Sequence, residues 1–133
     1  MQTITLKKPD PKKAEEYFSA KCEFTTGPVE LWHMIKENPK EFKVIDVRAE
    51  EDYKKEHIPG AYNLPRGKWE TFDVLSKDLP NILYCYSQTC HLAAKAGKLF
   101  ASKGYPVMEM EGGFEAWKER ELETEKKENT SCH

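Results

Sequence analysis

The sequence lacks any long hydrophobic run. None of its 133 residues lies in a stretch that approaches the ~18 consecutive apolar residues of a membrane-spanning helix. It also lacks an excess of positive charge, since 21 basic residues oppose 23 acidic ones and leave a net charge of −2. Such a balance offers no basic field for nucleic acid and no cationic face for a membrane surface. We therefore expect neither of these partners.

The cysteine pattern lacks the CxxC pair that structural zinc sites commonly use, because the four cysteines are Cys22, Cys85, Cys90 and Cys132. Cysteine and histidine are adjacent at two places, Cys90-His91 and Cys132-His133. The second pair lies at a charged terminus, so we expect no metal. The first ten residues lack the apolar core of a secretory signal, and we expect a cytoplasmic protein with reduced thiols.

Segments of strand and helix character alternate along the chain. Asp10-Pro11 is a typical helix start and predicts a leading helix over residues 11–20. Further helices are predicted to begin near Gly27-Pro28, at residue 91 and at Gly112-Gly113, and extended segments at residues 43–47, 61–64, 82–85 and 107–110. The strands are apolar rather than alternating, which favours an α/β fold with a parallel sheet covered by helices on both faces.

Cys85 ends the predicted strand 82–85 and precedes a loop and a helix. Ligands of such folds bind beyond the carboxyl ends of the strands, and this strand delivers a reactive residue there. Inward amides of the loop and the positive end of the helix dipole favour a thiolate, which is the nucleophilic form. A small buried cysteine chosen for packing would also satisfy this position, so both interpretations stay open.

Three segments in order resemble the signatures of the rhodanese-like domain family. The first comprises Val44–Arg48 and His57-Ile58-Pro59-Gly60-Ala61, the second is Leu83–Ser87, and the third is Met108–Trp117. The resemblance covers about residues 22–120 and implies a central, parallel five-stranded sheet with helices on both faces. We accordingly expect an N-terminal helical extension at residues 1–21, the rhodanese-like domain at 22–122, and a charged, disordered tail at 123–133.

The resemblance implies a sulfurtransferase or persulfide carrier. Cys85 would accept a sulfane sulfur and pass it to a thiol or other nucleophile, without a metal or organic cofactor. The substrate-binding loop would be formed by Tyr86, Ser87, Gln88, Thr89 and Cys90. The expected partner is a small sulfur donor or a persulfidated protein.

The length and charge of the loop separate the activities found on this fold. A six-residue loop, Cys85 to Cys90, resembles the sulfur-handling branch, whereas the related phosphatases carry one more residue and an arginine. His91 occupies that arginine's place here, which disfavours phosphatase chemistry. The loop also lacks the basic residues common in members that use thiosulfate, so we expect thiosulfate to be a poor donor.

Two alternatives remain open. Some members of the family have lost activity, so the chain can instead be a catalytically inactive interaction module. Cys90 is placed to act as a resolving thiol, which would make Cys85 and Cys90 a thiol-disulfide redox pair, or it fills space beside the helix. His91 as a cation would assist a thiolate, His57 is expected to be structural, and Arg48 is expected to pair with Glu51 or Glu56.

Overall fold

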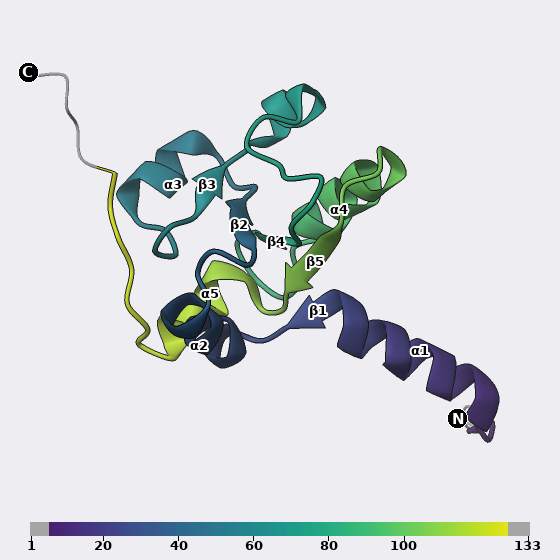
Figure 1. Cartoon of the computed structure of the whole chain (residues 1–133). Coiled ribbons are helices and arrows are strands. Elements are labelled where there is room, and N and C mark those ends of the chain that lie inside the picture. Colours follow the sequence, from purple (N-terminus) through teal and green to yellow (C-terminus); the bar gives the residue numbers. More distant parts are fainter. Residues whose placement is uncertain (1–5, 128–133) are drawn as a thin grey trace, which may run out of the picture.

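A computed structural model of the chain describes residues 6–127. Its centre is a sheet of five parallel strands in the order β1-β5-β4-β2-β3 (Figure 1). The strands are β1 (Thr25–Thr26), β2 (Lys43–Asp46), β3 (Tyr62–Asn63), β4 (Asn81–Tyr84) and β5 (Val107–Met110). The predicted parallel five-stranded α/β sheet is therefore confirmed, and β4 lies at its centre.

Helices cover both faces of this sheet, as predicted. They are α1 (Pro11–Phe24), α2 (Pro28–Glu37), α3 (Glu50–Lys55), the 3₁₀ helix η1 (Arg66–Thr71), α4 (Leu92–Ser102) and α5 (Gly113–Glu119). Side chains of α2 and α5 pack on one face, and side chains of η1 and α4 pack on the other. No helix within residues 6–127 is both long and apolar enough to cross a membrane.

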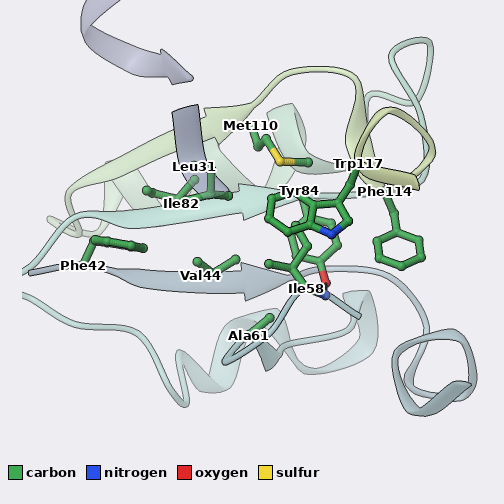
Figure 2. Close-up of a cluster of buried hydrophobic side chains, with 10 residues drawn as sticks. All are labelled: Leu31, Phe42, Val44, Ile58, Ala61, Ile82, Tyr84, Met110, Phe114 and Trp117. Atoms are coloured by element: carbon green, nitrogen blue, oxygen red, sulfur yellow. Dashed lines mark hydrogen bonds between the residues drawn. The ribbon is translucent and has the colours of Figure 1, made fainter. Parts of the chain in front are cut away.

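Two apolar clusters fill the layers on either side of the sheet. In the first, Leu31 of α2 and Trp117 of α5 meet Ile82 and Tyr84 of the central strand (Figure 2). The second contains alternate residues of the same strands, and Cys85 belongs to it. Strand residues thus face apolar side chains on both sides, which accounts for the apolar rather than alternating strands.

Helix α1 begins as predicted, since the side chain of Asp10 accepts a 3.1 Å hydrogen bond from the backbone N–H of Lys12. It continues beyond the predicted end at residue 20 and runs to Phe24, so the expected boundary at residue 21 falls inside it. None of its residues is buried, and it extends away from the sheet (Figure 1). An ion pair between Lys21 and Glu111, 2.7 Å long, ties its last turn to the end of β5.

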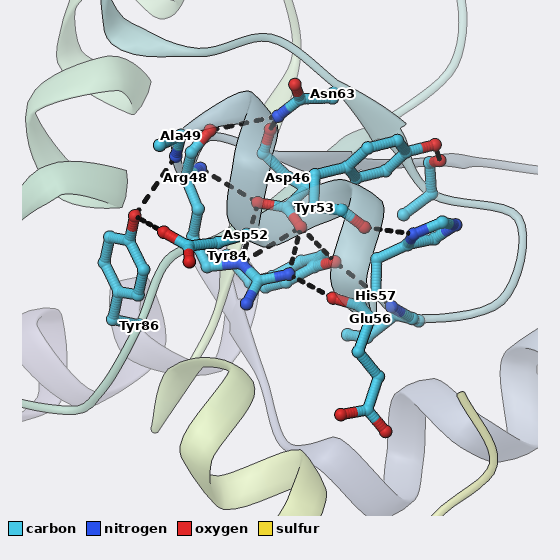
Figure 3. Close-up of polar contacts among 12 residues, drawn as sticks. Asp46, Arg48, Ala49, Asp52, Tyr53, Glu56, His57, Asn63, Tyr84 and Tyr86 are labelled. Carbon is cyan, nitrogen blue, oxygen red and sulfur yellow. Dashed lines mark hydrogen bonds and ion pairs between the residues drawn. The ribbon is translucent and has the colours of Figure 1, made fainter. Parts of the chain in front are cut away.

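A buried ion pair joins Asp46 and Arg48, whose side chains are 2.7 Å apart and nearly free of solvent contact (Figure 3). The hydroxyl of Tyr84 donates to Asp46 at 2.6 Å, and Arg48 also donates to the backbone carbonyl of Glu56. The expected pairing of Arg48 with a Glu51 or Glu56 carboxylate is therefore wrong. Asp46 ends β2 and lies two residues before Arg48, so both side chains point to the same side of the chain. A buried guanidinium needs a carboxylate within direct reach, and Asp46 provides it.

The segment that follows α5 packs onto the domain over residues 123–127. Glu125 forms an antiparallel bridge with His57, and its carboxylate accepts a 2.7 Å hydrogen bond from the N–H of Gly60. The predicted disorder of the tail therefore does not describe this part, because backbone pairing with His57 orders it; residues 128–133 lie outside the described residues. His57 itself is held by the carbonyl of Tyr53 at 2.7 Å, which is the structural role expected for it.

Candidate active site

Cys85 directly follows the central strand β4, at the carboxyl edge of the sheet. Only 2% of its surface is exposed. It belongs to an apolar cluster with Val47, which follows β2, Leu83 of β4 and Ala93 of α4. Cys85 therefore stands at the end of a buried strand, as the sequence predicted, and its side chain lies within the apolar layer.

The Cys85 thiol lies within hydrogen-bond distance of two backbone carbonyls, that of Cys90 at 3.4 Å and that of Ser87 at 3.9 Å. The backbone amides of Ala93 and Ser87 lower the pKa of the thiol. Burial outweighs the amides and raises the pKa of the Cys85 thiol to about 11. The resting state therefore holds a thiol, which contradicts the thiolate expected from the strand end and the helix dipole.

Burial is the main cause of this difference, and the direction of the loop amides contributes to it. The N–H of Cys90 donates to the carbonyl of Ser87 at 3.2 Å rather than to the Cys85 sulfur. The backbone amide of Tyr86 lowers the pKa of Cys90 instead of that of Cys85. The predicted ring of inward amides is therefore not closed around the Cys85 sulfur.

Cys90 is half-buried and its thiol contacts that of Cys85. Burial raises the pKa of Cys90, but the backbone amide of Leu92, the neighbouring Cys85 thiol and the backbone amide of Tyr86 together outweigh it, so the pKa lies below the ordinary thiol value. Of these two neighbouring thiols, Cys90 has the lower pKa and is the one that ionises first.

Tyr86 points away from the sulfur atoms. Its hydroxyl donates to the carboxylate of Asp52 at 2.6 Å and accepts from the N–H of Ala49 at 3.2 Å (Figure 3). These two bonds tie the loop to the start of α3, which begins at Glu50. Thr89 is exposed, and its hydroxyl contacts that of Ser87 at 3.3 Å.

Gly112 and Gly113, at the start of α5, lie directly against the backbone of the cysteine loop. The backbone N–H of Phe114 donates to the carbonyl of Cys85 at 2.8 Å, and the N–H of Glu115 donates to the carbonyl of Tyr86 at 2.9 Å. Gly113 has φ +66°, and a Cβ there would lie 2.5 Å from the backbone nitrogen of Ser87. The glycine pair thus lets α5 begin directly against the cysteine loop.

A hollow of about 70 Å³ opens beside Cys85. Its wall is made by the loop, the end of β5 and the glycine pair: Cys85, Ser87, Gln88, Glu109, Met110, Glu111, Gly112 and Gly113. Organic ligands generally need a pocket several times larger. The hollow therefore suits a group of one or two heavy atoms added to the cysteine.

Comparison with known proteins agrees with this geometry. The family model of the rhodanese-like domain matches residues 27–120. The chain belongs to the rhodanese-like domain family. A thiosulfate sulfurtransferase, GlpE of Coxiella burnetii, is 28% identical over 92 residues, which are 68% of this chain and 82% of that protein. The tRNA sulfurtransferase of Desulfurococcus amylolyticus is 32% identical over 76 residues, 57% of this chain, but these are only 15% of that protein.

Solved structures resemble this rhodanese-like chain over most of its length. The BH2092 protein of Bacillus halodurans superposes with a TM-score of 0.81 and 35% identity, covering 89% of this chain and 88% of that one. A rhodanese-like domain protein of Staphylococcus aureus superposes with a TM-score of 0.63, covering 71% of this chain and 90% of that one. Its identity of 23% supports the fold alone.

In this rhodanese-like domain, the structure brings together only part of the predicted loop. Ser87 and Gln88 line the hollow with Cys85, whereas Tyr86, Thr89 and Cys90 do not. His91 is exposed, precedes α4 at its N-cap position and makes no capping bond through its side chain. Cys132 and His133 lie outside the described residues.

Sequence analysis missed Glu109 and Glu111, which line the hollow. The signal was present in the order of residues in β5, where Glu109 stands alone as a charged residue between Met108 and Met110. A charge within an apolar strand marks a side chain at the rim of the sheet. Its proximity to Cys85 depends on the strand order, which places β5 next to β4.

Proposed function

We propose that the chain is a sulfurtransferase in which Cys85 accepts a sulfane sulfur and passes it on as a persulfide. The observation that carries this proposal is the location of Cys85 at the base of a hollow of about 70 Å³, at the carboxyl end of the central strand. A site of that size accepts one additional sulfur atom without displacing the domain around it. The resemblance to named sulfurtransferases supports the same chemistry.

The reaction consists of two displacements at sulfur. The Cys85 thiolate attacks the outer sulfur of a donor persulfide; the donor's sulfur–sulfur bond breaks, a new one forms on Cys85, and the donor leaves as a thiolate that takes up a proton. An acceptor thiolate then attacks the outer sulfur of the Cys85 persulfide, which restores Cys85. No net oxidation occurs and no cofactor is required.

Cys90 provides a base beside the Cys85 thiol, since Cys90 has the lower pKa of the two and ionises first. Because the lower pKa also makes the Cys90 thiolate the weaker base, the Cys85 thiolate that attacks the donor is a minor species in equilibrium with it. The partners are a small sulfur donor or a persulfidated protein, and free Cys22, Cys85 and Cys90 favour a reducing compartment such as the cytoplasm.

The direct experiment is intact-protein mass spectrometry after incubation with a low-molecular-weight persulfide. We expect a gain of one sulfur atom in the wild type, its loss in Cys85→Ser, and its retention in Cys22→Ser, which alters an exposed thiol on α1. Subsequent addition of an acceptor thiol should remove the sulfur. Absence of the gain with persulfides and with thiosulfate alike would contradict the proposal.

The contact between the two thiols favours a second function, that of a thiol-disulfide redox enzyme. The Cys90 thiolate would attack the inner sulfur of a Cys85 persulfide and expel hydrosulfide, leaving a Cys85–Cys90 disulfide that an external thiol must reduce. Release of sulfide with formation of one disulfide, both abolished in Cys90→Ser, would support it. A persulfide that survives unchanged beside Cys90 would exclude it.

Burial of Cys85 and its raised pKa favour a third function, that of a catalytically inactive interaction module. In that case Cys85→Ala should preserve every property of the wild type in a cell that lacks the native chain. Loss of those properties in Cys85→Ala, with unchanged folding, would argue for the enzyme.

A further inference from the structure

Glu109 lies on the same face of the sheet as Cys85. Its neighbours Met108 and Met110 in β5 pack into the cluster with α2 and α5, so alternation directs Glu109 toward the α4 face. In the parallel register Glu109 is the partner of Leu83 on β4, two residues before Cys85. Strand geometry therefore fixes this carboxylate beside the cysteine.

The hollow at Cys85 is negatively charged. Glu109 and Glu111 both line it, and none of its lining residues is lysine or arginine. Glu111 is paired with Lys21 of α1 at 2.7 Å, which compensates its charge. Glu109 forms no salt bridge within residues 6–127, although the exposed His91 lies near enough to influence it. Lys21 influences it in the same direction as His91, but neither forms an ion pair with Glu109. A carboxylate without an ion-pair partner in the wall repels any anion that approaches the sulfur.

We propose that Glu109 selects sulfur donors and acceptors by charge, so that the site takes compounds that are neutral or cationic next to the reacting sulfur, such as the persulfide of an aminothiol. This inference rests on the proposed sulfur transfer at Cys85. Thiosulfate, a dianion, is the class of donor that Glu109 excludes. Glu109 repels thiosulfate, and the loop has no basic residue that would attract it; both effects disfavour this donor.

Paired reagents with the same two-carbon spacing between sulfur and a group of opposite charge test the inference. The hydropersulfides of cysteamine and of 3-mercaptopropionate are compared as donors to wild type, Glu109→Gln and Glu119→Gln, an exposed control at the end of α5. We expect a preference for the cationic donor of roughly tenfold at low salt, reduced severalfold in Glu109→Gln and unchanged in Glu119→Gln. Glu109→Lys should reverse the preference and raise the rate with thiosulfate.

A second measurement does not depend on sulfur transfer. Alkylation of Cys85 by neutral iodoacetamide and anionic iodoacetate is followed at peptide level by mass spectrometry. The ratio of the two rate constants should fall severalfold in Glu109→Gln, and 0.5 M salt should lower it in the wild type. A ratio that is the same in wild type and Glu109→Gln overturns the inference, as does labelling of Cys85 too slow to exceed the Cys85→Ser background.

The two measurements separate failure of this inference from failure of the proposed function. Persulfide formation without charge discrimination would refute the role of Glu109 and leave sulfur transfer intact. Charge-dependent alkylation without persulfide formation would leave the charged wall in place but refute its role in selecting sulfur compounds.

Discussion

The carbonyl of Cys85 accepts a 2.8 Å hydrogen bond from the backbone N–H of Phe114, so the cysteine loop and the start of α5 form one unit. Gly113, which precedes Phe114, lies so close to the loop that a methyl group there would contact the Ser87 nitrogen at 2.5 Å. The third family signature is therefore part of the site, because it fixes the backbone on either side of the sulfur.

Gly113→Ala should unfold more readily than the wild type, by about 2 kcal/mol or more, because left-handed backbone and a backbone clash both oppose the methyl group. Gly60→Ala is the matched control: φ is +80° there, but nothing lies within 4 Å of the added carbon, so only the backbone term of about 1 kcal/mol remains. Denaturation by urea measures both. Equal losses in the two variants would contradict the close approach to Ser87.

Alkylation of Cys85 as a function of pH should give a midpoint well above that of an ordinary thiol, since burial raises its pKa to about 11. The neighbouring Cys90 also raises this value, so Cys90→Ser should move the midpoint downward. Cys22→Ser should leave it unchanged, because Cys22 is exposed on α1. A midpoint that rises in Cys90→Ser would refute the coupling of the two thiols.

Asp46→Asn should destabilise the domain by about 3–5 kcal/mol, because it leaves the buried guanidinium of Arg48 without its counter-charge. Glu50→Gln breaks an ion pair with Lys54 whose side chains are both half exposed, and it should not measurably change the free energy of unfolding. Thermal or urea denaturation compares the two. A small loss in Asp46→Asn would mean that water reaches Arg48.

Tyr86→Phe should loosen the cysteine loop, because the hydroxyl joins Asp52 and the N–H of Ala49. We expect faster amide hydrogen exchange over residues 86–90 and a loss of stability of about 1 kcal/mol or less, since the ring is partly exposed. Tyr62→Phe alters another partly exposed tyrosine and should leave that exchange unchanged. Unchanged exchange in Tyr86→Phe would show that the backbone bonds from Phe114 and Glu115 hold the loop without the Tyr86 hydroxyl.

Charge selection at the hollow should weaken in acid. Burial and the adjacent Glu111 carboxylate raise the pKa of Glu109, while His91 and Lys21 act in the opposite direction. As the pH falls through this raised pKa, Glu109 becomes neutral and the ratio of iodoacetamide to iodoacetate labelling at Cys85 should decline. The Cys85 thiolate fraction cancels in this ratio, and a ratio independent of pH would contradict the role of Glu109.

The raised pKa of Glu109 also determines how the stability of the domain depends on pH. An acid whose pKa is higher in the folded state binds more protons folded than unfolded, so its contribution is favourable below the unfolded pKa and is lost as the pH rises through the folded pKa. Glu109→Gln cannot ionise at this position, so it should have a higher free energy of unfolding than the wild type at neutral pH. The difference should vanish in acid, where Glu109 is protonated, and urea denaturation at the two pH values measures it.

Sequence patterns predicted four of the five strands of the sheet and missed the two-residue edge strand β1, Thr25–Thr26. Short apolar runs predicted the strands to within about a residue, as with Val107–Met110, because buried parallel strands are recognisable from composition. The position of Cys85 followed from the strand that precedes it. Its protonation state did not, because the direction of the amides depends on backbone torsions, and the Cys90 N–H turns to Ser87 instead.

The sequence also did not predict which residues the charged side chains contact. Arg48 pairs with Asp46, and Glu125 contacts His57 across 68 positions, a contact that no local pattern encodes. The acidic wall required the strand order, since Glu109 and Cys85 approach only when β5 lies beside β4.

The bridge between Glu125 and His57 has a practical consequence for where the chain is cut or fused. Trp117 donates its indole N–H to the carbonyl of Glu123, and Gly60 donates to the carboxylate of Glu125. A protein that ends at residue 122 would leave both donors without their acceptors. Any shortened protein used for measurements should therefore keep residues 123–127.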